Sequence, residues 1–230
     1  MTMMTILRNL VFYAVFYVGS VFYVSLAALV ARLFPRHARG MPEGWSAFHR
    51  WCVVHLLGIR VVIEGAPSSE PVLYALKHES FFEAIDLPTL LPHPAMFGKV
   101  ELFAIPGWGR AAAAYGAIPV ARDQGAKALR TMMALARERV QSGRPLAIFP
   151  EGTRVPHGTQ PELKSGFMGI YKLIGLPIVP VAVCSGPVYH RRWKQAGGTI
   201  RIRFGEPVPP GLDRDEAEAR VRAAINALNG

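Results

Sequence analysis

A histidine followed by two carboxylates is the first group of residues in this sequence that could do chemistry. His78 follows a short apolar run that ends at Leu76, and Glu83 and Asp86 come five and eight residues after the histidine. A histidine can remove a proton from a hydroxyl group when a carboxylate orients its ring and stabilises the imidazolium ion. This spacing is compatible with a general base at His78, although the chain has seven histidines and a structural role is the alternative.

A second polar group also follows an apolar run, in the segment Phe149-Pro150-Glu151-Gly152-Thr153-Arg154. Gly152 allows the backbone to approach a ligand closely, Thr153 offers a hydroxyl group, and the guanidinium fork of Arg154 matches a phosphate group. Three further stretches place a cation near a strand end or a turn: Lys99–Leu102, Gly116–Arg122 and Leu163–Phe167. The alternative for Phe149–Arg154 is a turn with a solvated arginine, and each of the three other cations could be an ordinary surface charge.

These residues lie between the elements of an expected α/β domain. Short runs rich in Val, Ile and Leu predict strands, and they alternate with helical stretches, which is typical of one domain with a largely parallel sheet flanked by helices. The expected strands are Ile59–Ile63, Val72–Leu76, Ala95–Phe97, Ala117–Val120, Leu146–Phe149, Ile178–Val183 and Thr199–Phe204. Helices are expected over Ala126–Gln141 and from Asp213, where Glu216 would complete a capping box.

The N-terminal part of the chain predicts contact with a membrane. Leu10 to Val30 is a run of 21 residues without charge, and a helix of this length would be about 31 Å long, close to the hydrocarbon core of a bilayer. A second apolar stretch, Trp45–Leu57, allows a helix hairpin in one leaflet instead of a span, and a cleaved signal peptide is a third interpretation. We therefore expect membrane-associated helices over residues 1–58 and a catalytic domain over residues 59–230.

The charge distribution suggests where this domain lies and what it meets. Arg32, Arg36 and Arg39 follow the apolar run while Arg8 alone directly precedes it, which predicts that the domain lies at the cytoplasmic face of the cell membrane. The net charge of +10 indicates an anionic partner such as phospholipid headgroups or an acidic carrier protein. No nucleic-acid motif is present, so we expect no nucleic-acid partner. The two cysteines, Cys52 and Cys184, indicate neither a disulfide framework nor a metal cluster.

Taken together, four of these stretches resemble the motifs of the 1-acylglycerol-3-phosphate acyltransferases of glycerolipid synthesis. His78 to Glu83 is similar to the first motif, a histidine and an acidic residue separated by four positions. Gly116–Arg122, Phe149–Arg154 and Ile178–Ala182 resemble the second, third and fourth motifs, and the third matches in every position. The family's acidic partner is usually Asp, whereas the matching residue here is Glu83.

The resemblance implies a fatty acyl transfer from acyl-CoA or acyl carrier protein to the hydroxyl group of a lysophospholipid. In this scheme His78 and Glu83 are catalytic, with Asp86 as the competing partner of the histidine, and no metal or cofactor is needed beyond the thioester. The residues expected to bind the acceptor are Lys99, Arg122, Glu151, Gly152, Thr153, Arg154 and Lys164. Alternatives are another acceptor, such as a lyso-ornithine lipid or glycerol 3-phosphate, a membrane-anchored hydrolase, and a non-catalytic lipid-binding protein on the same scaffold.

Overall fold

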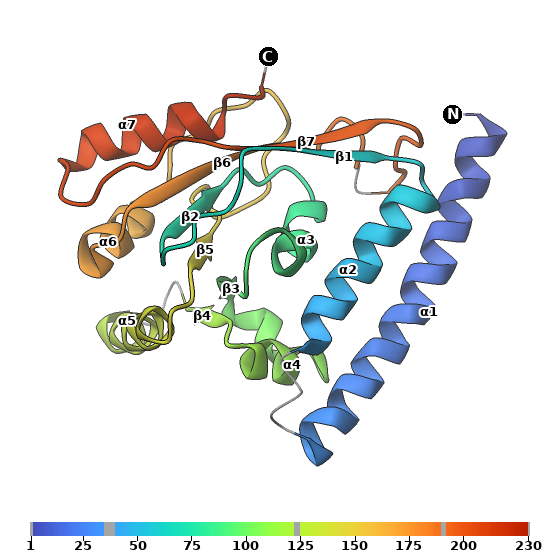
Figure 1. The fold of residues 1–230 in the computed structure, drawn as a ribbon, viewed down its shortest axis with the longest axis horizontal. Coiled ribbons are helices and arrows are strands. Elements are labelled where there is room, and N and C mark those ends of the chain that lie inside the picture. Colours follow the sequence, from blue (N-terminus) through green and yellow to red (C-terminus); the bar gives the residue numbers. More distant parts are fainter. Residues whose placement is uncertain (1, 35–39, 122–124, 190–191, 230) are drawn as a thin grey trace.

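A seven-stranded sheet forms the centre of the computed structural model, which describes residues 2–34, 40–121, 125–189 and 192–229 (Figure 1). The strands lie in the order β1-β7-β6-β2-β5-β3-β4, and every neighbouring pair is parallel except β6 and β7. Their bounds are β1 Arg60–Glu64, β2 Leu73–Leu76, β3 Ala95–Lys99, β4 Ile118–Val120, β5 Leu146–Ile148, β6 Ile178–Cys184 and β7 Thr199–Phe204. The predicted α/β fold with a largely parallel sheet is therefore confirmed.

Strand β2 shows why the sheet is buried on both faces. Its four residues are all buried, and they alternate between two apolar cores. Tyr74 and Leu76 belong to the core on one face, while Leu73 and Ala75 belong to the core on the other. Successive side chains of a strand point to opposite faces, so a continuous apolar run is what a central strand between two helical layers requires.

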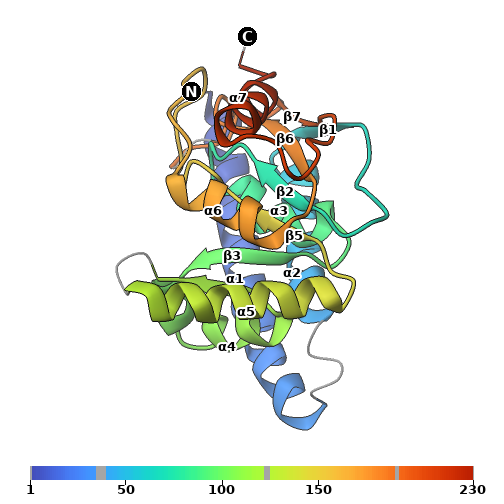
Figure 2. The same cartoon turned by 90° about the vertical axis from the view of Figure 1, so that its left-hand side faces the viewer.

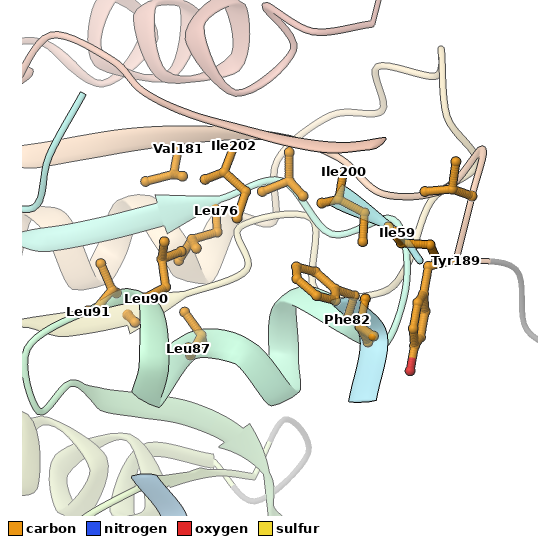
Figure 3. Close-up of a cluster of buried hydrophobic side chains, with 14 of the residues drawn as sticks. Ile59, Leu76, Phe82, Leu87, Leu90, Leu91, Val181, Tyr189, Ile200 and Ile202 are labelled. Carbon is orange, nitrogen blue, oxygen red and sulfur yellow. The ribbon is translucent and has the colours of Figure 1, made fainter. Parts of the chain in front are cut away.

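Helices cover both faces, as the two perpendicular views show (Figures 1 and 2). The first core holds residues of three helices, α1 Met3–Leu33, α2 Gly40–His55 and α3 Phe82–Leu90. Figure 3 shows part of this core, with Phe82 and Leu87 of α3 on one side and Ile200 and Ile202 of β7 on the other. The second core holds residues of α5 Gly125–Gln141, α6 Ser165–Ile174 and α7 Arg214–Ile225. The short helix α4 Trp108–Tyr115 follows the 3₁₀ helix η1 Val100–Ala104 and packs against it, α1 and α2.

The first two helices form an antiparallel pair along one side of the molecule (Figure 1). Phe12 and Phe16 of α1 are buried against the rest of the domain, and Trp45 of α2 donates a 2.9 Å hydrogen bond to Ser20. A Cβ atom at Gly19 would lie 2.4 Å from the ring of Phe48, so glycine allows the two helices to approach here. Both helices thus share a core with the sheet, and the division of the chain after residue 58 stays a prediction.

Helix α1 is also hydrogen-bonded to a segment that is distant in sequence. Asn9 is fully buried, and its side chain accepts a 2.8 Å hydrogen bond from the backbone N–H of Lys194 and donates one of 2.9 Å to the carbonyl of the same residue. The opposite face of α1 is apolar and exposed, with Leu10, Val18 and Phe22 all more than half accessible. Met3–Ala27 is long and apolar enough to cross a membrane. One stripe of α1 therefore belongs to the protein core and the other is available to lipid.

Two local expectations differ from the structure. The stretch around Lys164 is not only a turn, because α6 begins at Ser165 directly after it. The capping box at α7 is absent: Asp213 accepts a hydrogen bond from the backbone of Asp215, but Glu216 pairs with Arg220 one turn along the helix. A surface arginine at the i+4 position thus replaces the backbone as the partner of Glu216.

Candidate active site

His78 lies at the carboxyl end of β2, and its backbone and ring are both held in place. Its N–H donates a 2.9 Å hydrogen bond to Oε2 of Glu151, and its carbonyl accepts one of 2.8 Å from Val155. Its ring stacks on Phe149 with 4.1 Å between the ring centroids. The side chain is 15% exposed, so the imidazole is oriented by the protein and can still be reached by a ligand.

Glu83 is the carboxylate that contacts this ring. The Nδ1 atom of His78 lies 3.0 Å from Oε1 of Glu83, which also accepts 2.6 Å hydrogen bonds from the backbone N–H groups of Glu79 and Ser80. The other carboxylate oxygen, Oε2, accepts hydrogen bonds from the hydroxyl groups of Ser80 and Ser185. With the Nδ1 proton directed at Glu83, the lone pair of the ring is on Nε2, where a general base needs it.

Asp86, the competing partner, lies elsewhere. Its carboxylate forms a two-point ion pair with Arg50 of α2, and the Nε–Oδ1 distance is 2.7 Å. Because α3 begins at Phe82, Glu83 is in its first turn beside His78, whereas Asp86 is about one turn further along and meets α2. Burial raises the pKa of Asp86, and the Arg50 guanidinium opposes this shift. The spacing of five residues is therefore the one that brings an acid to the histidine.

Glu151 of the Phe149–Arg154 motif is hydrogen-bonded to the backbone of His78 and so connects the two motifs. It is buried, and while Oε2 accepts the His78 N–H, Oε1 lies 2.8 Å from Nζ of Lys77. Lys77 is fully buried and donates two further bonds, each of 2.7 Å, to the carbonyl of Thr159 and to the side chain of Asn226. The carboxylate of Glu151 is thus used within the protein, and the structure places it under His78 and not on a ligand-facing surface. Sequence reasoning missed Lys77, because lysine is rarely buried and its partner Glu151 is 74 positions away in the chain.

A pocket of about 280 Å³ opens at the segment that follows His78, and His78 itself is not among the described residues that line it. Its wall is formed by Glu79, Ser80, Phe81, Arg154, Pro156, His157, Gly186, Pro187 and Tyr189. The guanidinium of Arg154 lies over the ring of Phe81, 3.8 Å from its centroid, so the cation is held at the pocket by a cation–π contact. A cation beside a general base suits an acceptor that carries both an anionic group and a hydroxyl group.

The other predicted binding residues are distributed differently. Thr153 is exposed, and Gly152 has a positive φ of 70°, a conformation that glycine tolerates and that turns the loop back after β5. Lys99 ends β3 and Lys164 precedes α6; both are exposed, and neither is among the described residues that line the pocket. Arg122 lies outside the described residues.

Comparisons with known proteins identify relatives of this chain. Residues 58–184 match the family model described as Acyltransferase. The chain is 27% identical over 225 residues to a 1-acyl-sn-glycerol-3-phosphate acyltransferase of Pseudomonas aeruginosa, covering 96% of this chain and 86% of the relative. It is 28% identical over 183 residues to the alpha form from Ovis aries, covering 75% of this chain and 64% of that protein. The crystal structure of the 1-acyl-sn-glycerophosphate acyltransferase of Thermotoga maritima has the same fold, with a TM-score of 0.75, 23% identity and 98% coverage of both chains.

Proposed function

This chain belongs to the acyltransferase family, and we propose that it transfers a fatty acyl group from acyl-CoA or acyl carrier protein to the free hydroxyl group of 1-acylglycerol 3-phosphate, giving phosphatidic acid. The observation that carries the proposal is the buried Glu83 carboxylate on Nδ1 of His78, which also accepts a hydrogen bond from Ser80 in the wall of a pocket that holds Arg154. Relatives named for this substrate support the choice of acceptor.

The reaction begins when Nε2 of His78 removes the proton of the acceptor hydroxyl group. The oxygen attacks the thioester carbonyl, and the resulting tetrahedral intermediate expels the thiolate, which receives the proton from the imidazolium. Glu83 stabilises the imidazolium between these two steps because its charge lies against Nδ1. No acyl-enzyme is required, since a thioester is already an activated acyl group.

Arg154 binds the phosphate group of the acceptor through charge-assisted hydrogen bonds. Its place at the pocket wall, where the guanidinium lies over Phe81, supports this role, and the next residue, Val155, donates a hydrogen bond to the carbonyl of His78. Gly152 and Thr153 shape the loop that presents Arg154, and Glu151 holds this loop against His78. Lys99, Lys164 and Arg122 stay proposed contributors of positive charge to acceptor binding.

Substitutions test the two roles separately. His78→Ala should lower kcat by at least about a thousandfold, the size of a general-base contribution, while matched His55→Ala on the exposed end of α2 should leave it unchanged. Arg154→Ala should chiefly raise KM for the phosphate-bearing acceptor, with Arg220→Ala on α7 as the control. Normal turnover by His78→Ala, or a fall in kcat alone for Arg154→Ala, would contradict the assignments.

The acceptor and the donor are identified by product analysis. The proposal predicts that a panel containing lysophosphatidic acid, a lyso-ornithine lipid and glycerol 3-phosphate gives the highest kcat/KM with lysophosphatidic acid. Release of free fatty acid without an acceptor would indicate a hydrolase instead. If acyl carrier protein is the donor and is attracted by the net charge of +10, the activity of the enzyme with this donor should fall more steeply with added salt than its activity with acyl-CoA.

The enzyme meets its lipid through α1 and α2, which we place in one leaflet at the cytoplasmic face. Helix α1 is 31 residues long, about 46 Å, but its inner stripe packs on the protein and not on lipid. The exposed apolar stripe would face acyl chains while basic residues attract anionic headgroups at about 1 kcal/mol each. Single cysteines at Met3 and Leu33 should then react with a membrane-impermeant maleimide from the same side; reaction from opposite sides would indicate a span.

A further inference from the structure

A second histidine–carboxylate pair lies on the pocket wall and has no part in the proposed reaction. Nδ1 of His157 lies 2.9 Å from Oε1 of Glu79, and Nε2 of His157 lies 4.0 Å from Sγ of Cys184. Glu79 follows His78, His157 comes from the loop after Arg154, and Cys184 ends β6. One ligand atom from each of the three residues falls within 4.8 Å of the others. The fold thus gathers a carboxylate, an imidazole and a thiol whose association was not predicted from the spacing of these residues.

The hydrogen bonds of Glu79 determine which of these atoms can bind a ligand. Its Oε2 atom accepts bonds of 2.9 and 2.8 Å from the backbone N–H groups of Ser185 and Gly186, and Oε1 is occupied by His157. Because this carboxylate takes the Nδ1 proton, the lone pair of the His157 ring is on Nε2, the atom next to Cys184. A carboxylate that fixes the tautomer of an imidazole is the usual outer partner of a metal-binding histidine.

The spacing of the two ligand atoms suits zinc. Zinc binds imidazole nitrogen at about 2.0–2.1 Å and thiolate sulfur at about 2.3 Å, so a tetrahedral ion needs roughly 3.5 Å between the two atoms. The separation of 4.0 Å between Nε2 and Sγ therefore has to close by only about half an ångström. A thiolate with an imidazole is a donor pair that favours zinc over the hard cations magnesium and calcium.

We propose that Nε2 of His157 and Sγ of Cys184 form a zinc-binding site, oriented by Glu79, in the wall of the pocket beside His78. His157 is 28% exposed at its side chain and lines the pocket with Glu79 and Gly186. Water or an oxyanion from the pocket would fill the remaining coordination positions of the ion. A bound ion displaces the thiol proton of Cys184. The proposal does not depend on the acyl-transfer reaction.

The test uses the full chain in detergent, freed of metal with a chelator and titrated with Zn²⁺ by calorimetry. One ion per chain should bind, and Co²⁺ in its place should produce a sulfur-to-cobalt charge-transfer band. Cys184→Ala should abolish the band and lower zinc affinity at least about tenfold, whereas matched Cys52→Ala, at a cysteine packed in the first core, should change neither. Glu79→Gln should weaken binding about 10- to 100-fold through the loss of the orienting carboxylate.

Two further comparisons make the outcome decisive. His157→Gln should weaken zinc binding as Cys184→Ala does, while His55→Gln should bind as the unmodified chain does. His78→Ala should bind zinc normally even though it is expected to have lost acyl transfer, so the two proposals fail independently. Absence of the charge-transfer band, unchanged affinity in Cys184→Ala, or equal binding of Mg²⁺ would overturn the zinc site. The band in the unmodified protein reports sulfur ligation even if a variant fails to fold.

Discussion

Replacing Glu83 by glutamine isolates the charge of the dyad, because the local hydrogen bonds divide between the two carboxylate oxygens. The donors that must be kept, the His78 ring and the backbone N–H groups of Glu79 and Ser80, all bond to Oε1. Among the described residues, the partners of the other oxygen are the hydroxyl groups of Ser80 and Ser185, which can rotate and accept a bond from an amide. Glu83→Gln therefore fits the site and removes only the negative charge.

The expected effect is large on catalysis and small on stability. An amide cannot stabilise the imidazolium that forms at His78, and assisted proton transfer contributes about 10²- to 10⁴-fold. We expect kcat to fall about a thousandfold, or about 4 kcal/mol at roughly 1.4 kcal/mol for each factor of ten. The fold should lose about 1–2 kcal/mol, the typical effect of altering one buried hydrogen-bonding group.

The assay is acyl transfer to lysophosphatidic acid in mixed micelles, with thermal unfolding of each variant followed by circular dichroism. The double variant His78→Ala with Glu83→Gln should be no slower than His78→Ala alone, because the acid acts through the histidine. A Glu83→Gln protein that keeps more than a tenth of the activity, or a double variant whose losses multiply, would refute the dyad.

Three other predictions concern stability. Lys77→Met leaves the Glu151 carboxylate buried without its ion-pair partner, so it should cost about 3–5 kcal/mol of unfolding free energy, and adding Glu151→Gln should recover part of this in denaturant titrations. Burial lowers the pKa of His49 to about 3. As the pH falls from about 6.5 towards 3, the unfolded chain therefore takes up a proton that the folded chain excludes, and the free energy of unfolding should drop by about 2 kcal/mol by pH 5. The His49→Gln protein should not show this loss. Gly109→Ala places a Cβ atom 1.9 Å from a carbonyl oxygen of η1 and should lower Tm by several degrees, whereas Gly166→Ala, which has open space in α6, should not.

The sheet was predictable from sequence because burial on both faces leaves an unmistakable pattern. Runs such as Leu146–Ile148 and Ile178–Cys184 contain little but apolar residues, and all seven expected strands are present within one or two residues. Helix α6 was harder to predict, since it contains Gly166 and Gly169, residues that disfavour helices. Helix α4 was not predicted, because it is short, lies between two glycines and is stabilised by packing against α1 and α2.

The site was predictable only where its contacts are local. His78 and Glu83 are five residues apart, so one helix start decides their meeting. The ion pair of Lys77 with Glu151 spans 74 positions and the contact of Glu79 with His157 spans 78. Both depend on β5 lying next to β2, and neither residue spacing nor composition contains the order of strands in a sheet. The buried support beneath the histidine therefore emerges only from the topology.

The two hydrogen bonds between the Asn9 side chain and the Lys194 backbone make the first helix part of the folded domain and not a detachable anchor. Cutting it away would remove Phe12 and Phe16 from the first core, where they pack on Tyr189 and His49. It would also remove the hydrogen bonds that the Asn9 side chain makes to the backbone of Lys194. A water-soluble version of this protein therefore requires polar substitutions on the exposed face of α1, at positions such as Val18 and Phe22. Deleting α1 would remove an exposed apolar surface but would expose part of the first core to water.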